Sequence, residues 1–195
     1  MNTVIKSSDL TIGIDIGGTK ISAGVVDSSG NIIDSSRIST PAEGGKELIL
    51  AVINLIKELK EKHEIKGIGI SIAALISSDY GTIVGAPNIA NLSKLNFVNE
   101  IKAEFKLPIV VENDANSAMW AEFKFGNAKG LNPVMFFIIG TGVGGGLVID
   151  GKLFKGANGI GAEFGHMCVV PNGLLCGCGS KGCIEQYASG GALIR

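Results

Sequence analysis

An α/β protein with a mixed sheet is the fold class that the sequence predicts, and two observations lead to it. The first is a series of three strand patterns, Leu10–Asp15, Ile21–Asp27 and Asn31–Ile38, joined by glycine-containing turns, which predicts an antiparallel meander. The second is the alternation of helical and buried-strand patterns after the meander, which predicts further strands and a mixed sheet.

The helix after the meander is predicted by its apolar residues, which recur at steps of three and four, with charged residues between them. These apolar residues are Leu48, Ile49, Val52, Ile53, Ile56 and Leu59. We expect His63, at the exposed end of this helix, to be a solvated side chain. The pattern then predicts a buried strand at Ile65–Ala73, part of a helix at Val98–Phe105 and another buried strand at Ile109–Glu112.

A second unit is predicted to begin near Asn113, with a short helix through Phe125 and a strand at Val134–Ile139. The glycine run at 140–146 is expected to turn that strand into another at Leu147–Asp150. Segments 16–32 and 139–154 share a strand, a Gly/Thr turn and a glycine-led strand, so we expect two similar halves that face each other across a cleft. We place the domains at 1–112, a small α/β domain, and 113–195, the start of a larger one.

The charge composition argues against two classes of binding partner. The net charge is −1, with 17 Lys and Arg against 18 Asp and Glu and no basic run, which argues against a nucleic acid or a membrane surface. The first nine residues carry no secretory hydrophobic region, and no apolar run is long enough to span a membrane. We therefore expect a soluble cytoplasmic protein that binds small molecules.

One imidazole and three sulfurs come close together near the end of the chain. His166, Cys176, Cys178 and Cys183 lie at short loop spacings among glycines, which predicts a tetrahedral Cys3His zinc site. A reducing cytoplasm favours metal ligands over disulfides for such a cluster. Four protein ligands leave no position for water, so the zinc is expected to be structural. The alternative is that the cysteines are small buried hydrophobic residues.

Two glycine turns between strands are candidates for binding phosphate. In the first, Gly17 and Gly18 leave backbone amides accessible, Thr19 and Lys20 add a hydroxyl and a charge, and Asp15 is placed to hold magnesium through water. Its spacing matches neither the Walker nor the Rossmann motif. The second turn contains Thr141, Gly142 and Gly144. The alternative for each is an ordinary hairpin.

Acidic side chains supply candidates for proton transfer and for sugar binding. Asp114 follows a buried strand and precedes a helix, so it is either a helix N-cap or a carboxylate at the ligand-binding edge of the sheet. There it would accept the proton of an alcohol during phosphoryl transfer. Glu163 and Glu185 flank the cysteine loop and suit sugar hydroxyls. A two-carboxylate glycosidase is the competing use, but it would leave the phosphate turns without a role.

Taken together, these motifs resemble the ROK family of sugar kinases over nearly the whole chain. The matching segments are DIGGTK at 15–20, APN at 86–88, ENDAN at 112–116, GTGVGGG at 140–146, GAEFGH at 161–166 and CGCGSKGCIEQYASG at 176–190. The resemblance implies an actin-like ATPase (ribonuclease H-like) fold with two similar α/β halves around a cleft. The family's length implies that the second half is incomplete here and that the chain is a fragment or a truncated reading frame.

The resemblance also implies roles for single residues. Asp114 would be the base that deprotonates the 6-hydroxyl of a hexose. Sugar ligands would be Asn88, Asn113, Asp114, Glu163, His166 and Glu185, with His166 also on zinc. ATP and Mg²⁺ would be bound by Asp15, Gly17, Gly18, Thr19, Lys20, Thr141, Gly142 and Gly144.

The segment EQYASG resembles the glucokinases of the family and favours glucose. Ala74 stands where relatives have a glycine near the sugar, which favours a changed hexose preference. The alternatives are a kinase for N-acetylmannosamine, N-acetylglucosamine or fructose, a sugar-binding remnant without catalysis, and a regulator, although no helix-turn-helix precedes the first strand. The full-length form is expected to be a homodimer.

Overall fold

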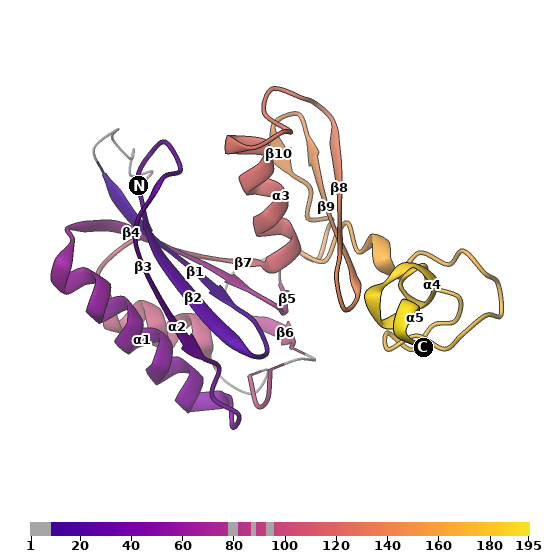
Figure 1. The fold of residues 1–195 in the computed structure, drawn as a ribbon, viewed down its shortest axis with the longest axis horizontal. Coiled ribbons are helices and arrows are strands. Elements are labelled where there is room, and N and C mark those ends of the chain that lie inside the picture. The colour runs from indigo at the N-terminus through magenta and orange to yellow at the C-terminus, as the bar shows by residue number, and fades with distance from the viewer. Residues whose placement is uncertain (1–8, 78–81, 87–88, 93–95) are drawn as a thin grey trace. The chain divides into compact units, whose positions relative to one another are not determined.

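The computed structural model describes residues 9–77, 82–86, 89–92 and 96–195. The chain falls into two compact units, Met1–Asp114 and Ala115–Arg195, shown in Figure 1. Among the described residues, no helix has both the length and the apolar character that crossing a bilayer requires.

The first unit is built on a five-stranded sheet in the order β3-β2-β1-β4-β7. Its strands are β1 (Leu10–Ile16), β2 (Lys20–Val26), β3 (Ile32–Ser39), β4 (Ile65–Ile72) and β7 (Ile109–Asn113). The pairs β1–β2 and β2–β3 are antiparallel, whereas β1–β4 and β4–β7 are parallel. The predicted α/β fold with a mixed sheet is therefore confirmed.

Helices α1 (Gly45–Lys62) and α2 (Phe97–Glu104) lie on one side of this sheet (Figure 1). The alternation in β1 explains the packing, because Ile12, Ile14 and Ile16 are buried in the core while Gly13 and Asp15 between them are exposed. Two short strands, β5 (Leu75–Ile76) and β6 (Ile83–Gly85), pair with each other beyond β4. The unit thus has one core face, and the end of β1 carries a polar side chain on the other face.

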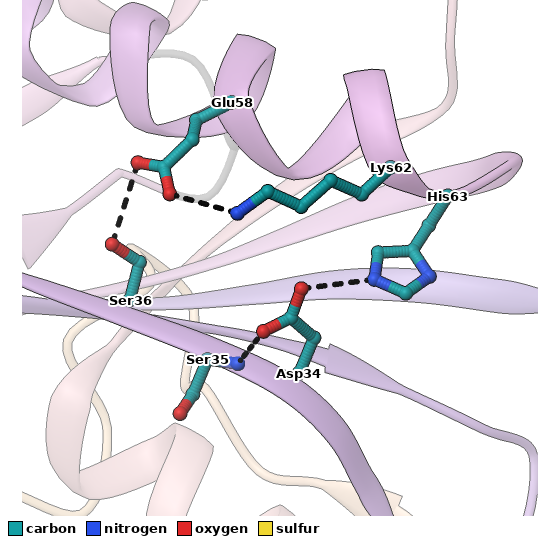
Figure 2. Close-up of polar contacts among 6 residues, drawn as sticks. All are labelled: Asp34, Ser35, Ser36, Glu58, Lys62 and His63. Atoms are coloured by element: carbon teal, nitrogen blue, oxygen red, sulfur yellow. Dashed lines mark hydrogen bonds and ion pairs between the residues drawn. The ribbon is translucent and has the colours of Figure 1, made fainter.

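Polar contacts join α1 to the outer strand β3, as Figure 2 shows. His63 is not the solvated side chain that the sequence suggested: its Nε2 lies 2.9 Å from Asp34 Oδ2, and its side chain is 22% exposed. The backbone N–H of Ser35 donates to the other Asp34 oxygen at 2.8 Å. The Ser36 hydroxyl donates to Glu58 at 3.4 Å. The His63–Asp34 and Ser36–Glu58 contacts in Figure 2 connect the C-terminal end of α1 to β3.

The contact with His63 makes stability depend on pH. The hydrogen bond from His63 and the Ser35 N–H lower the pKa of Asp34 below its ordinary value. A depressed carboxyl pKa stabilises the folded state above the unfolded pKa, and the stabilisation is lost as pH falls through the folded pKa. We expect the difference in unfolding free energy between wild type and Asp34→Asn to be largest above about pH 4 and to vanish in stronger acid.

Urea unfolding from pH 7 to pH 2.5 measures this difference. Because His63 is the main partner, Asp34→Asn should have a smaller effect in a His63→Ala background, which makes a double-mutant cycle. A difference that stays constant across the acid range would contradict the role given to this pair.

The second unit repeats the meander of the first. Its sheet has the order β10-β9-β8, and both pairs are antiparallel. The strands are β8 (Val134–Ile139), β9 (Val143–Ile149) and β10 (Lys152–Leu153), and helix α3 (Asp114–Phe125) precedes them. Met119 of α3 and Val148 of β9 are fully buried together in a small core.

The glycine run was expected to be a turn, but most of it is strand. β9 begins at Val143 instead of Leu147, because residues 143–146 pair with residues 136–139 of β8. The glycines also let neighbouring elements approach the strand closely. A Cβ on Gly146 would lie 2.6 Å from Met119 Cβ in α3, and one on Gly145 would lie 2.5 Å from the ring of Phe164. Only the segment 140–142 turns.

The remainder of the second unit is loop-rich. It contains the 3₁₀ turn η1 (Phe164–His166), two short helices, α4 (Glu185–Ala188) and α5 (Gly190–Ile194), and isolated bridges such as Cys168↔Cys183. Many of its apolar side chains are exposed, including Leu175 at 68%. A hydrophobic core therefore does not account for the order of this segment.

Candidate functional site

Asp15 lies within β1, one residue before the strand ends, and not at its end as predicted. Its exposed carboxylate accepts a hydrogen bond from the Ser71 hydroxyl of the adjacent strand β4 at 3.2 Å. Because β1 and β4 are parallel, both side chains lie toward the carboxyl ends of their strands, where ligands of α/β sheets bind. Ser71 was not singled out from the sequence, since its partner is 56 residues away.

The first glycine turn is held in shape by Thr40. The Thr40 hydroxyl donates to the Gly17 carbonyl at 2.7 Å, and its N–H donates to the Thr19 carbonyl at 3.0 Å. Residues 18–20, which include the predicted Gly18 and Lys20, are exposed. Sequence reasoning missed Thr40, which follows β3, because the meander that brings it to the turn is a property of the fold.

Asn113 and Asp114 lie where β7 ends and α3 begins. Asp114 is exposed and is the first helical residue of α3, one position after the N-cap that was one of its two predicted roles; the other role, a carboxylate at the sheet edge, is compatible with its place. The Asn113 amide donates to Asp114 Oδ1 at 3.0 Å and to the Ala74 carbonyl at 3.2 Å. Ala74 itself is buried. Asn88, a predicted sugar ligand, lies outside the described residues.

The second glycine turn is braced from the C-terminal helices. Its backbone closes through the Gly140 N–H and the Gly142 carbonyl at 3.0 Å, and Gly190 donates to the Gly140 carbonyl at 2.8 Å. Gly191 donates to the carbonyl of Thr141, whose side chain is exposed. Of the predicted phosphate ligands here, Gly144 lies in β9, where a Cβ would come within 2.8 Å of Ile138.

The structure brings together the four predicted metal ligands. One ligand atom from each of His166, Cys176, Cys178 and Cys183 lies within 4.8 Å of all the others. His166 Nδ1 is 3.5 Å from Cys176 Sγ, and Cys178 Sγ is 3.6 Å from Cys183 Sγ. A tetrahedral zinc with Zn–S bonds of about 2.3 Å places its ligand atoms about this far apart. The donor set therefore fits zinc in number, type and spacing.

The environments of the thiols differ. The Ser180 N–H lowers the pKa of Cys178, whereas burial raises the pKa of Cys183 to about 12. A metal-bound cysteine is a thiolate, so binding must displace protons from these sulfurs. The free energy of metal binding offsets the burial of that charge.

Glu185 connects the metal ligands to the second glycine turn. Its Oε2 accepts a hydrogen bond from the Val143 N–H at 3.0 Å, and its Oε1 lies 3.9 Å from Cys176 Sγ. The approach is so close that a Cβ on Gly142 would fall 2.4 Å from Oε2. Gln186, next along α4, contributes its amide at 3.7 Å from Cys176 Sγ.

Glu163, the other predicted sugar ligand beside the cysteine loop, precedes η1. Its side chain is half-buried, and its carbonyl accepts a hydrogen bond from the His166 N–H at 3.0 Å. Gly165 between them needs to be glycine, because a Cβ would lie 1.9 Å from the Val143 carbonyl. Glu163 and His166 are therefore held against the start of β9.

Two groups of predicted residues emerge. In the first unit, Asp15 lies near the end of β1 and the 17–20 turn follows it, while Asn113 ends β7 of the same sheet and Asp114 begins α3. In the second unit, Glu185 links the turn at 140–142 to the Cys3His cluster. The arrangement offers carboxylates for proton transfer and hydroxyl binding, exposed glycine turns for phosphate, and sulfur and nitrogen ligands for a metal.

Comparison with known proteins gives consistent matches. A sequence model described as the ROK family matches residues 11–195. A glucokinase from Streptomyces coelicolor is 48% identical over 186 residues, which are 95% of this chain and 58% of that protein. An N-acetylmannosamine kinase from Yersinia pseudotuberculosis is 37% identical and is matched over 93% of this chain and 62% of its own length.

Solved structures agree. The crystal structure of a ROK family glucokinase from Streptomyces griseus in complex with glucose and AMPPNP superposes with a TM-score of 0.84 at 46% identity. The match covers 95% of this chain and 59% of that one. The fold is therefore the actin-like ATPase fold that the motifs predicted, and this chain spans about three fifths of the relatives it matches.

The bridge made by Glu185 is testable by hydrogen exchange. Glu185→Ala removes the charged acceptor of the Val143 N–H, a bond worth about 1.5–3 kcal/mol, so exchange of this amide should become about 10- to 100-fold faster. Glu185→Gln keeps a neutral acceptor at the same place and should give an intermediate rate. NMR-detected exchange measures both variants. Equal rates in wild type and both variants would rule out the bridge.

Proposed function

Because the chain belongs to the ROK family, we propose that it serves the ATP-dependent phosphorylation of a hexose, glucose first, at the 6-hydroxyl. The observation that carries the proposal is the Asn113–Asp114 pair, whose exposed carboxylate stands between the end of β7 and the start of α3. The match to a glucokinase from Streptomyces coelicolor at 48% identity supports glucose.

Asp114 is proposed as the general base. The Asn113 amide, itself anchored on the Ala74 carbonyl, donates to one carboxylate oxygen and so orients the group. The carboxylate lies at the first turn of α3, where the helix N-terminus carries partial positive charge. As the sugar oxygen bonds to the γ-phosphorus and the bond to ADP breaks, Asp114 accepts the hydroxyl proton.

The two glycine turns are proposed to bind the phosphates of ATP. In the first, Gly17, Gly18, Thr19 and Lys20 offer backbone amides, a hydroxyl and an ammonium group. In the second, Thr141 and Gly142 of the turn and Gly144 of β9 would contribute, although a Cβ on Gly144 would already come within 2.8 Å of Ile138. Asp15, with Ser71, fits a hydrated Mg²⁺, which would neutralise charge on the phosphates.

Hexose hydroxyls are proposed to bind Asn88, Asn113, Asp114, Glu163, His166 and Glu185. The donor set of the Cys3His cluster fits a structural zinc, with Nδ1 of His166 directed to the metal and the other ring nitrogen left for a sugar. The cluster would then fix the positions of His166 and, through Cys176, of Glu185.

A second candidate is an N-acetylmannosamine kinase. The 37% identity to such an enzyme from Yersinia pseudotuberculosis favours it. The reaction and the proposed base are the same for both candidates, so only the substrate separates them.

The decisive experiment is phosphorylation by the 195-residue chain with Mg-ATP over a panel of glucose, mannose, fructose and N-acetylated hexosamines. Asp114→Asn keeps the shape of the side chain but cannot take up the proton, so turnover should fall by about 10²- to 10⁴-fold, a larger loss than that of hexose affinity. A coupled assay for ADP gives the turnover, and calorimetry gives the affinity.

The best substrate of the panel names the hexose. Equal turnover by wild type and Asp114→Asn would contradict the role of the base. No turnover by wild type, with glucose still bound, would contradict catalysis by this chain and leave sugar binding as its function.

The zinc proposal has its own test. Cys178→Ala removes one of four ligands, so we expect the variant to lose the roughly one zinc per chain of the wild type and to bind hexose about 10- to 100-fold more weakly. Metal analysis and calorimetry measure the two effects. Cys168→Ala, outside the cluster, is the control and should change neither. Normal hexose affinity in a zinc-free Cys178→Ala protein would contradict the proposal that the zinc positions the sugar ligands.

A further inference from the structure

Cys168 is the one cysteine of the chain that is not part of the four-residue cluster, and it lies directly beside it. Cys168 and Cys183 face each other in an antiparallel bridge. The hydrogen bonds of this bridge are made by the flanking residues, from Val169 N–H to the Gly182 carbonyl at 2.8 Å and from Ile184 N–H to the Met167 carbonyl at 2.9 Å. The two cysteines are therefore a non-hydrogen-bonded pair.

This pairing suits a covalent link. Opposite residues of a non-hydrogen-bonded pair have Cα atoms about 4.5 Å apart, and disulfides form at Cα separations of about 4.4–6.8 Å. The sulfur of Cys168 already lies against the backbone that leads into Cys183, since a Cβ on Gly182 would be 3.2 Å from it. A disulfide would then require rotation of the two cysteine side chains rather than a large movement of the backbone.

The two sulfurs differ in access. Cys168 is exposed, whereas Cys183 is fully buried at 0% exposure. A small oxidant reaches Cys168 first, because oxidation of cysteine follows exposure as well as thiolate character. Cys183, which faces Cys168 across the bridge, can then react with the oxidised Cys168.

We propose that Cys168 and Cys183 form an oxidisable pair through which hydroperoxides remove a ligand from the metal centre. The proposal rests on the zinc site and goes beyond the kinase reaction. In the first step the Cys168 thiol attacks a peroxide oxygen, the O–O bond breaks, and sulfenic acid and water are formed, for hydrogen peroxide. In the second, the Cys183 sulfur attacks the sulfenic sulfur, the S–O bond breaks, and a disulfide and a second water result.

Atoms and electrons balance in this sequence: two thiols lose two electrons and two protons in total, and one peroxide is reduced to two waters. A disulfide sulfur no longer provides a thiolate, so the metal retains three of its four protein ligands. Zinc is then released, and a dithiol reductant reverses the change.

A competing pair is Cys178 and Cys183, whose sulfurs are 3.6 Å apart. Both belong to the cluster, so a disulfide between them requires direct oxidation of a metal ligand and no other cysteine. The two routes therefore differ in their dependence on Cys168.

The experiment compares the reduced, zinc-loaded wild type with Cys168→Ser, a conservative change at an exposed position. Both proteins are treated with hydrogen peroxide in the presence of a chromogenic zinc chelator, and free thiols are then blocked for peptide mapping. We expect zinc release to be at least about tenfold slower in Cys168→Ser and the wild-type map to contain a Cys168–Cys183 disulfide. Metal analysis and circular dichroism before oxidation establish that both proteins start folded and loaded.

Equal release rates in the two proteins, or a map with Cys178–Cys183 as the disulfide, would overturn the proposal. A wild type that carries no zinc as isolated would overturn the zinc site and the coupling to it together. In contrast, a Cys168–Cys183 disulfide with zinc retained would overturn the coupling alone, which separates the two failures.

Discussion

The loop-rich segment of the second unit depends for its order on the cluster of His166, Cys176, Cys178 and Cys183. In that segment the helices are four and five residues long, and apolar side chains such as Val169 and Leu175 are exposed at 48% and 68%. Burial of so little apolar surface does not offset the conformational entropy of an ordered loop. Metal ligation supplies such free energy in small loop-rich segments, and the proposed zinc would supply it here, since the four ligand atoms lie within 4.8 Å of one another.

Short contacts connect the cluster to the start of β9. Glu185 takes its place in α4 two residues after Cys183, and its carboxylate holds the Val143 N–H at the start of β9. Gly165 lies against the carbonyl of the same Val143. Direct contacts therefore connect the candidate phosphate turn, the candidate sugar ligand Glu185 and the candidate metal ligand Cys176.

Elements whose residues carry their own pattern were predictable from the sequence. The periodic helix α1, the meander and the spacing of the Cys3His ligands all follow from local arrangement, and the structure contains them. Contacts between distant residues were not predictable in the same way. The Asp34–His63 pair is separated by 29 residues, and the glycines of β9 look like a turn until Met119 and Phe164 are known to pack on them.

The glycines of β9 and its surroundings also affect how an alignment of relatives should be interpreted. Gly145, Gly146 and Gly165 would be invariant in evolution even without a ligand, because any side chain there collides with the protein itself. Invariance at these positions is evidence of packing and gives no information about nucleotide binding. Gly140 is different, since a Cβ there would meet nothing within 4 Å. Because the protein itself leaves room for alanine at position 140, the absence of alanine there among relatives would indicate that a ligand binds at the turn.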